Sequence, residues 1–328
     1  MARLYAARSL GRDPREPPAP GGGRAATSRS PAVRSSRPAL RGGDTARHTA
    51  FAWRPQPERT HRRTARAPLV AARLPHRGWL FDLDGTVYIG EALVPGAAET
   101  VAALRGDGRR VAFLSNKPLQ TRADYAAKLR RLGVPADAED VINSSLVLAR
   151  HLAALDSGAP VFVIGEPPLV AELIAHGFEV RPDQRVRWVV IAFDRTFDYA
   201  KLNIALQAVR QGARLIATNP DRTCPVEGGE IPDCAGMMAA VEAVTGKTVE
   251  IVVGKPSPII LEVALARLDV PARDAVIVGD RIETDIVMGR RLGLGTVLVL
   301  SGVTRADDPR IAEIAPDLVL PSIRDLIR

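Results

Sequence analysis

The sequence contains few cysteines, few histidines and no long apolar run, and each shortage excludes a class of protein. Its two cysteines, Cys224 and Cys234, are too few for a disulfide framework and have no neighbouring histidine or second cysteine pair for a zinc site. A reduced, cytoplasmic compartment is therefore expected. No run approaches the roughly 18 apolar residues of a membrane-spanning helix, so no membrane partner is predicted. The histidines lie outside every stretch with recognisable chemistry, which disfavours a histidine base or nucleophile: His48, His61, His76, His151 and His176.

Acidic residues are scarce at the start of the chain. Residues 1–77 contain 17 arginines, no lysine and four acidic residues, which gives a net charge of +13, whereas the whole chain carries +8. The remainder is therefore mildly acidic, at −5. Because the basic excess belongs to this leader, the rest of the chain gives no electrostatic reason to expect a nucleic-acid partner.

The leader, residues 1–77, is also rich in arginine, proline and small residues and lacks an apolar period, which predicts disorder. Such a segment suits a targeting peptide or a basic arm that binds an acidic partner. A third interpretation is that it is absent from the native protein. No methionine occurs between Met1 and Met237, so translation could begin at a non-ATG codon near Val70. Peptides from residues 10–60 of the native protein would contradict that interpretation.

After the leader, apolar β-branched runs alternate with segments of helical period, which predicts an α/β fold with a parallel sheet. We expect a core formed by residues 78–117 and 250–328, interrupted by a smaller inserted α/β domain at residues 118–249. The expected strands are 78–81, 110–114, 161–165, 188–193, 215–218, 250–253, 275–278 and 296–300. The expected helices are 97–104, 121–132, 144–155, 168–176, 199–210, 258–268 and 283–292.

Two aspartates follow the first expected strand. In Asp82-Leu83-Asp84-Gly85-Thr86 the chain can turn tightly at the glycine, and side chains two positions apart share one face of a strand. Two carboxylates in one small volume repel each other unless a cation lies between them, and magnesium prefers such oxygen ligands. A surface turn is the alternative interpretation, since aspartate and glycine are both turn residues.

Three further strand ends carry groups that would complete such a site. Ser115-Asn116 offers a hydroxyl and a carboxamide, Lys255 offers an ammonium group, and Asp280 offers a carboxylate that could reach the same metal ion. Asp285, one helical turn later, could hold that carboxylate and the lysine in place. Taken singly, these are compatible with a strand cap, a solvated lysine and an acidic helix N-terminus. Together they favour a functional site, because ligands bind at the carboxyl edge of open parallel sheets.

These motifs, in this order, resemble those of the haloacid dehalogenase (HAD) superfamily of phosphohydrolases. The matching stretches are Asp82 to Thr86, Ser115, Lys255, and Gly279-Asp280 to Asp285. The run Gly254-Lys255-Pro256-Ser257, the run Gly279-Asp280-Arg281 and the long insertion are typical of the NagD-like branch, class IIA. Within it, residues 115–117, 217–222 and 235–238 resemble the arabinose-operon sugar phosphatases. The resemblance leaves out the leader.

The resemblance implies a HAD-like Rossmannoid core with an inserted cap of the C2 type. It gives Asp82 the role of nucleophile, which forms an aspartyl-phosphate, and Asp84 the role of general acid and then base. A true dehalogenase would need no acid for its leaving halide and no metal, so Asp84 and Asp280 argue against one. The segment between Thr86 and Ser115 is too short for the helical cap of the sugar phosphomutases of this superfamily.

The resemblance also implies the remaining site residues. Magnesium would be bound by Asp82, the backbone carbonyl of Asp84 and Asp280, with Asp285 supporting these groups from behind. The phosphoryl oxygens would be held by Ser115, the amide of Asn116 and Lys255. In the cap, residues 219–236 are the candidate loop for recognition of the leaving group, and residues 193–196 either face the substrate or form a plain turn.

The expected function is that of a magnesium-dependent phosphatase of small phosphorylated metabolites, with sugar phosphates favoured. Phosphoglycolate, glycerol phosphate and nucleotide monophosphates are the alternatives within this class. From another class, the rival is a non-catalytic protein of the same fold that acts as a regulator through its basic arm. The intact set of acidic and basic motif residues disfavours that rival. The sequence is compatible with a homodimer but does not identify the oligomeric state or the substrate.

Overall fold

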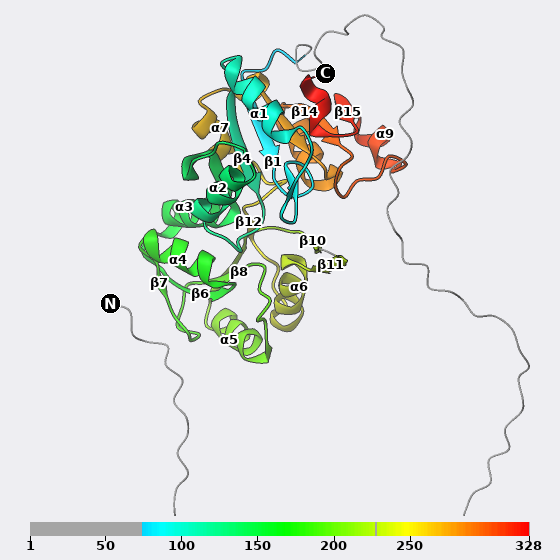
Figure 1. Cartoon of the computed structure of the whole chain (residues 1–328). Helices are drawn as coiled ribbons and strands as arrows, with labels where there is room; N and C mark the ends of the chain where they lie inside the picture. Colours follow the sequence, from blue (N-terminus) through cyan, green and yellow to red (C-terminus); the bar gives the residue numbers. More distant parts are fainter. Residues whose placement is uncertain (1–73, 227, 328) are drawn as a thin grey trace, which may run out of the picture. The chain divides into compact units, whose positions relative to one another are not determined.

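The computed structural model describes residues 74–226 and 228–327, which include both α/β layers (Figure 1). The expectations for residues 1–73, namely disorder, targeting, a basic arm and a start near Val70, lie outside the described residues. Within the described part, no helix has the length and apolar character that would let it cross a membrane.

A six-stranded parallel sheet lies at the centre of the first layer. Its strand order is β15-β14-β13-β1-β4-β5, and every neighbouring pair is parallel. The bounds are β1 Gly78–Asp82, β4 Arg110–Ser115, β5 Val141–Asn143, β13 Ala275–Gly279, β14 Gly295–Val299 and β15 Leu318–Leu320. The chain crosses from one half of the sheet to the other at β1, which pairs with both β4 and β13. The expected α/β fold is confirmed.

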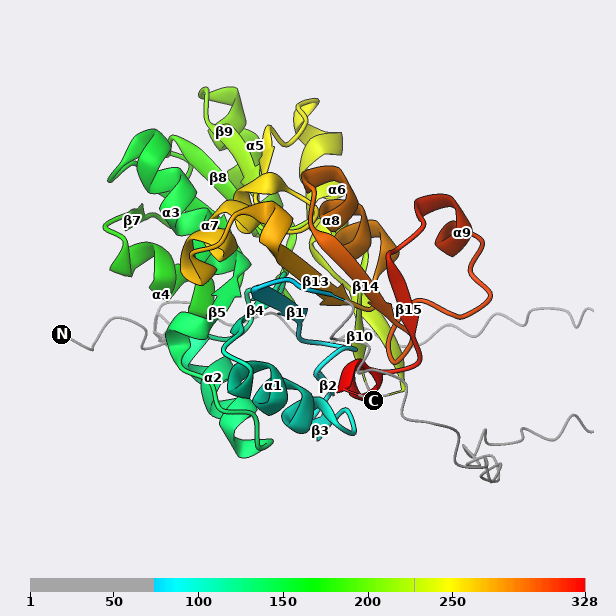
Figure 2. The same cartoon turned by 90° about the horizontal axis from the view of Figure 1, so that it is seen from above.

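Helices cover both faces of this sheet because its strands are apolar on both sides. Trp79 and Phe81 point to the face covered by α1 (Ala97–Gly106) and α2 (Arg122–Arg131), whereas Leu80 points to the face covered by α7 (Pro258–Leu268). Figure 2 shows these helices on opposite sides of β1 and β4. All three of these strand residues are fully buried.

The second layer has its own parallel sheet, with the order β12-β9-β8-β6-β7. The bounds are β6 Pro160–Ile164, β7 Glu179–Val180, β8 Trp188–Ile191, β9 Arg214–Ala217 and β12 Ile251–Val252. One face packs on α5 (Tyr199–Arg210) and α6 (Cys234–Thr245). The other packs on α3 (Ser144–Asp156) and α4 (Pro167–Ala175). Because α3 and α7 belong to the same buried cluster, one apolar core joins the two layers.

The remaining elements are short. Two antiparallel hairpins occur in the described residues, one of β2 (Tyr88–Ile89) and β3 (Ala92–Leu93), the other of β10 (Thr223–Val226) and β11 (Gly229–Pro232). The short helices are η2 Ala138–Asp140, η3 Ala272–Asp274, the π-helical η4 Ile282–Ile286, α8 Val287–Leu292, α9 Arg310–Ile314 and η5 Ile323–Ile327.

Several helices begin where a side chain can replace a missing backbone partner. Thr121 accepts a hydrogen bond from the backbone N–H of Asp124, whose carboxylate in turn accepts one from the backbone N–H of Thr121, so α2 starts with a capping box. Asn143 caps α3 and Ser257 caps α7 through a side-chain oxygen that accepts from a backbone N–H of the first turn, without the reciprocal bond. These polar residues fix the places where the chain leaves a strand or loop and enters a helix.

The division of the chain between the layers differs from the expected one. Strand β5, which was not predicted, pairs with β4, so residues up to at least 143 contribute to the first sheet. Strand β12, expected to be a core strand at 250–253, pairs with β9 in the second sheet. The sheet pairing at both ends therefore differs from the expected insertion at 118–249, and those domain bounds stay a prediction. The local pattern predicts that a segment is a strand, but the choice of partner depends on distant residues.

Candidate active site

Polar side chains from both layers meet at the carboxyl ends of their strands. Asp82 ends β1, Ser115 ends β4, and Asp280 follows β13 of the first sheet. Lys255 arrives from the other layer, because it follows β12, and Gly254 donates a backbone hydrogen bond to Thr218 there (2.8 Å). The site therefore lies where the strand order of the first sheet reverses, the usual position for ligands in open parallel sheets.

Lys255 is the buried cation of the site. Its Nζ lies 2.5 Å from Asp82 Oδ1 and 2.7 Å from Asp285 Oδ1, and its side chain is only 3% exposed. Burial alone would lower the pKa of Lys255, but the carboxylates of Asp285 and Asp82 reverse the effect and raise it. For Asp82, burial dominates over the attraction of Lys255 and raises its pKa to about 6. The lysine is thus fixed as an ammonium group between two anions.

Three buried carboxylates form a cluster suited to a cation. Asp82, Asp280 and Asp285 each have an oxygen within 4.8 Å of the others. Burial, followed by repulsion from Asp82 and Asp285, raises the pKa of Asp280. One oxygen of Asp280 accepts from the backbone N–H of Val303 (2.6 Å), while the other is buried without a hydrogen-bond partner among the described residues. A hard divalent ion would satisfy that oxygen and reduce the repulsion.

Glycines let the backbone approach this cluster closely. A Cβ atom at Gly85 or Gly302 would overlap the carboxylate of Asp280, and one at Gly279 would overlap that of Asp285. Gly85 also has φ = +89°, a conformation that other residues adopt only with strain. The backbone therefore forms a tight cradle around the acidic groups, which leaves little freedom for their side chains to move.

Gly302→Ala tests this cradle, because φ at Gly302 is outside the strained range and only the added methyl group matters. We expect kcat/KM for the reaction that the sequence predicts to fall about 100-fold, the upper end of the 10- to 100-fold that displaced supporting groups cost at metal sites. Gly106→Ala is the matched control, because it lies in α1 with no atom within 4 Å of the added Cβ. Steady-state kinetics of both variants measures the effect. Equal activity of the two would contradict a constrained Asp280.

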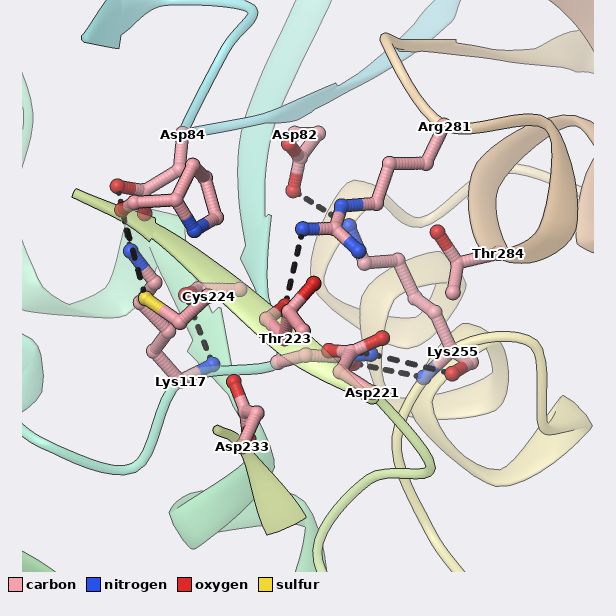
Figure 3. Close-up of a pocket in the computed structure, with 13 residues that line it drawn as sticks. Asp82, Asp84, Lys117, Asp221, Thr223, Cys224, Asp233, Lys255, Arg281 and Thr284 are labelled. Atoms are coloured by element: carbon pink, nitrogen blue, oxygen red, sulfur yellow. Dashed lines mark hydrogen bonds and ion pairs between the residues drawn. The ribbon is translucent and has the colours of Figure 1, made fainter. Parts of the chain in front are cut away.

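Asp84 lies in a different environment from the buried cluster. Its Oδ1 accepts a hydrogen bond from Lys117 Nζ (2.8 Å), and both side chains are about one-fifth exposed, at 22% and 19%. Although burial opposes it, the charge of Asp84 raises the pKa of Lys117. One oxygen of Asp84 is thus held by a lysine, while the carboxylate as a whole borders the cavity (Figure 3).

The carboxamide of Asn116 makes its hydrogen bonds within the protein. Its carboxamide accepts from the backbone N–H of Lys255 (2.8 Å) and donates to the carbonyl of Lys255 (3.1 Å) and to Asp221 (3.0 Å). These contacts occupy the carboxamide, so only its backbone N–H is left for an anionic ligand. Ser115 is buried, and its hydroxyl oxygen accepts from the backbone N–H of Lys117 (3.2 Å), which leaves its own proton for another acceptor.

The segment 219–236 closes the site from the second layer. Asp221, Thr223, Cys224 and Asp233 line the cavity opposite the strand ends (Figure 3), and Pro225 also lines it. Arg281 donates a hydrogen bond to the carbonyl of Thr223 (3.2 Å), which joins the first layer to the β10–β11 hairpin. Burial raises the pKa of Asp233 to about 6. The space between these residues and the strand ends is small, about 30 Å³.

Sequence reasoning missed several residues that border the cavity. Lys117 was part of a resembling run but was given no role, and Arg281 and Asp221 were not proposed as site residues at all. Their importance comes from tertiary contacts, with Asp84, Thr223 and Asn116 respectively. The sequence indicates these residues only by position: Lys117 and Arg281 lie within two residues of a recognised motif, and Asp221 lies in the candidate loop.

Comparisons with known proteins agree with this geometry. Residues 79–179 match a family described as haloacid dehalogenase-like hydrolase, and residues 252–326 match one described as HAD-hydrolase-like. The chain is 40% identical over 252 residues to sugar-phosphatase AraL from Bacillus subtilis, covering 76% of this chain and 92% of that protein.

Solved structures show the same relation. NagD from E. coli K-12 has a TM-score of 0.69 at 33% identity, covering 76% of this chain and 97% of that one. A glycerol phosphate phosphatase from Mycobacterium tuberculosis, solved in complex with magnesium, has a TM-score of 0.72 at 34% identity, covering 80% of this chain and 79% of that one. The resemblance to the NagD-like branch and to the sugar phosphatase of the arabinose operon is confirmed.

Proposed function

Because this chain belongs to the haloacid dehalogenase-like hydrolases, we propose that it is a magnesium-dependent phosphatase of small phosphate monoesters, with sugar phosphates favoured. Glycerol phosphates remain the alternative within this class, since relatives bear that name. The observation that carries the proposal is the contact of Asp82, at the end of β1, with Lys255 beside the cluster of Asp280 and Asp285.

Asp82 is the nucleophile. Its carboxylate oxygen forms a bond to phosphorus while the bond from phosphorus to the alcohol oxygen breaks, which gives an aspartyl-phosphate and the free alcohol. Water then attacks phosphorus, and Asp82 is released with inorganic phosphate. Its low exposure, 8%, supports this role because bulk water is kept from the reacting oxygen.

Asp84 transfers the protons. It gives a proton to the departing alkoxide in the first step and takes one from the attacking water in the second. Lys117 holds Asp84 Oδ1, so the oxygen that Lys117 does not contact is the one directed to the leaving group. The position of Asp84 in the cavity lining, two residues from Asp82, supports this division of roles.

Three groups hold the phosphoryl oxygens in this proposal. They are the hydroxyl of Ser115, the backbone N–H of Asn116 and the ammonium group of Lys255. The carboxamide of Asn116 acts indirectly, because its hydrogen bonds to the backbone of Lys255 set the position of that residue. Fixed donors of this kind stabilise the charge that spreads over the transferred group in the transition state.

Asp82, Asp280 and the backbone carbonyl of Asp84 are the proposed magnesium ligands, and Asp285 is the positioning residue behind them. When bound, magnesium would neutralise charge on the phosphoryl oxygens and the nucleophile. The oxygen of Asp280 that lacks a partner supports this assignment, as does the engagement of both Asp285 oxygens by Lys255 and the backbone N–H of Arg281 (3.2 Å).

The small cavity indicates that the layers are close together in this conformation. The space between the strand ends and the segment 219–236 is about 30 Å³, so we infer that this segment moves when substrate enters. We therefore assign this segment to leaving-group recognition and closure. A reducing, cytoplasmic setting fits the two free thiols, of which Cys224 borders the cavity.

The test is hydrolysis of p-nitrophenyl phosphate by the full-length protein with magnesium and with excess chelator. We expect chelation to reduce turnover at least about 100-fold, because the acidic cluster would lose the charge that balances it. Restoring magnesium should recover activity, whereas calcium, which prefers longer bonds and more ligands, should not. Equal rates with and without chelator would contradict the metal dependence. No turnover of any phosphate ester would contradict the proposed function itself.

A further inference from the structure

A second cavity opens beside the catalytic one. It has a volume of about 280 Å³, and it shares Asp84 and Lys117 with the catalytic cavity. We call it the basic pocket, defined by Asp84, Tyr88, Lys117, Gln120, Lys128 and Arg195. Because Asp84 is the proposed proton donor to the leaving group, any cavity that continues from Asp84 is a candidate for binding the alcohol part of the substrate.

The basic pocket has an excess of positive charge. Among the residues that the structure describes, three cations line it, from the loop after β4, from α2 and from the second layer, and Asp84 is the one acidic side chain there. Lys128 is the most enclosed, since its side chain is only 10% exposed. Lysine ammonium groups usually extend into water, so a buried one that borders a cavity is an unusual arrangement.

The charge of Lys128 is only partly balanced within the protein. Its Nζ lies 3.7 Å from the centre of the Tyr88 ring, a cation–π contact that fixes its position. Its carboxylate partner, Glu91 at 3.3 Å, is 71% exposed and also pairs with Arg131. Water screens such an exposed partner, so much of the positive charge of Lys128 remains available to attract an anion that enters the pocket.

Arg195 provides a second donor on the opposite layer. Its Nε lies 2.7 Å from Oε1 of Glu166, and its Nη2 lies 2.7 Å from Oε2. These two hydrogen bonds fix the plane of the guanidinium group. No hydrogen bond from Nη1 occurs among the described residues. A pre-oriented guanidinium group can therefore bind a carboxylate or phosphate oxygen with little loss of side-chain freedom. The run 193–196, left open between a substrate contact and a turn, supplies this residue.

The other large cavity that reaches Asp84 has the opposite character. It is lined by the acidic side chains of Glu91, Glu230 and Asp280 and by apolar groups such as Ile89 and Val226. Among the described residues it offers no cationic side chain to an anionic leaving group, whereas an uncharged one would be tolerated. The two cavities thus differ in the charge of their lining side chains.

We propose that the basic pocket binds an anionic group on the alcohol part of the substrate, an inference that rests on the proposed function. The preferred substrates are then phosphate esters that carry a second acidic group, either a carboxylate or a phosphate, a few bonds from the ester oxygen. Lys128 and Arg195 determine specificity for that second group. Neither takes part in the bond-breaking step, which belongs to Asp82 and Asp84.

Matched substrates test this inference. The kcat/KM of the full-length protein with magnesium is measured for 2-hydroxyethyl phosphate, 2-phosphoglycolate and ethylene glycol bisphosphate, which differ only in the second group. We expect at least one acidic substrate to exceed the neutral one about tenfold, as expected for one hydrogen bond to a charged group. The carboxylate and bisphosphate members distinguish the two kinds of anion.

Variants assign the preference to the pocket. Lys128→Gln and Arg195→Gln should each lower kcat/KM for the acidic substrate about tenfold and change the value for the neutral one less than about twofold. Arg131→Gln is the matched control, because Arg131 lies on the same helix and pairs with the same Glu91 but does not line the pocket. Lys128→Arg should retain the preference, which separates loss of charge from loss of folding.

Two results would overturn the inference about the basic pocket without contradicting the proposed phosphatase function. One is a wild-type protein that hydrolyses the neutral substrate as well as both acidic ones. The other is a fall in kcat/KM that is equal for acidic and neutral substrates in Lys128→Gln and Arg195→Gln. Hydrolysis of the neutral ester in either case would leave the proposed phosphatase function intact, whereas absence of all turnover would contradict both.

Discussion

Asp82→Asn should lower phosphatase turnover by about 10⁴-fold or more while leaving the fold intact. The substitution keeps the size and shape of the side chain but removes the nucleophilic oxygen, so no aspartyl-phosphate can form. It also removes one of three clustered carboxylates, and their mutual repulsion decreases. The amide oxygen can still accept from Lys255. We therefore expect the melting temperature without magnesium to be unchanged or higher.

The kinetics are measured with p-nitrophenyl phosphate and a sugar phosphate, and the melting temperature is followed with excess chelator. Asp107→Asn is the control, because it makes the same chemical change at an exposed position after α1. Residual activity above about 1% of the wild-type value would show that another group attacks phosphorus, because loss of a covalent nucleophile costs far more than that. A lower melting temperature would show that Asp82 serves the fold as well.

Much of this site could be predicted because it depends on local rules. Asp82, Ser115 and Asp280 lie at the ends of apolar runs, and the carboxyl ends of parallel strands share one edge. The sequence therefore specifies both the strands and the edge where the polar groups appear. The same reasoning places Lys255 at that edge, but it assigns the preceding strand to the first sheet. In the structure that strand, β12, pairs with β9 in the second sheet.

The features that could not be predicted depend on contacts between distant residues. Strand β5 has only three residues, and its short apolar run gives no signal apart from its pairing with β4. Lys117 looks like any solvated lysine until Asp84 is placed 2.8 Å from its Nζ. The contact of Asn116 with Asp221 joins positions 105 residues apart, and no local pattern encodes it. These contacts decide how the layers close over the site.

Lys255→Met should reduce both stability and activity, in contrast to Asp82→Asn. Methionine fills a similar volume but leaves the buried carboxylates of Asp82 and Asp285 without the cation between them. Removing one partner of a buried ion pair costs about 3–5 kcal/mol, which corresponds to a fall of roughly 10 °C in melting temperature for a chain of this size. Turnover should fall at least about 10³-fold, because a fixed positive group facing the phosphoryl oxygens is lost.

A double substitution separates the two effects of Lys255. In Lys255→Met with Asp285→Asn, a neutral carboxamide replaces the buried carboxylate that would lack a partner, so most of the lost stability should return while activity stays low. Lys247→Met, at an exposed position, is the control and should change neither property. Thermal melting with chelator and steady-state kinetics measure both. If Lys255→Met melted at the wild-type temperature, the buried carboxylates would not depend on this lysine for compensation. Its contact with Asp82 would then serve catalysis alone.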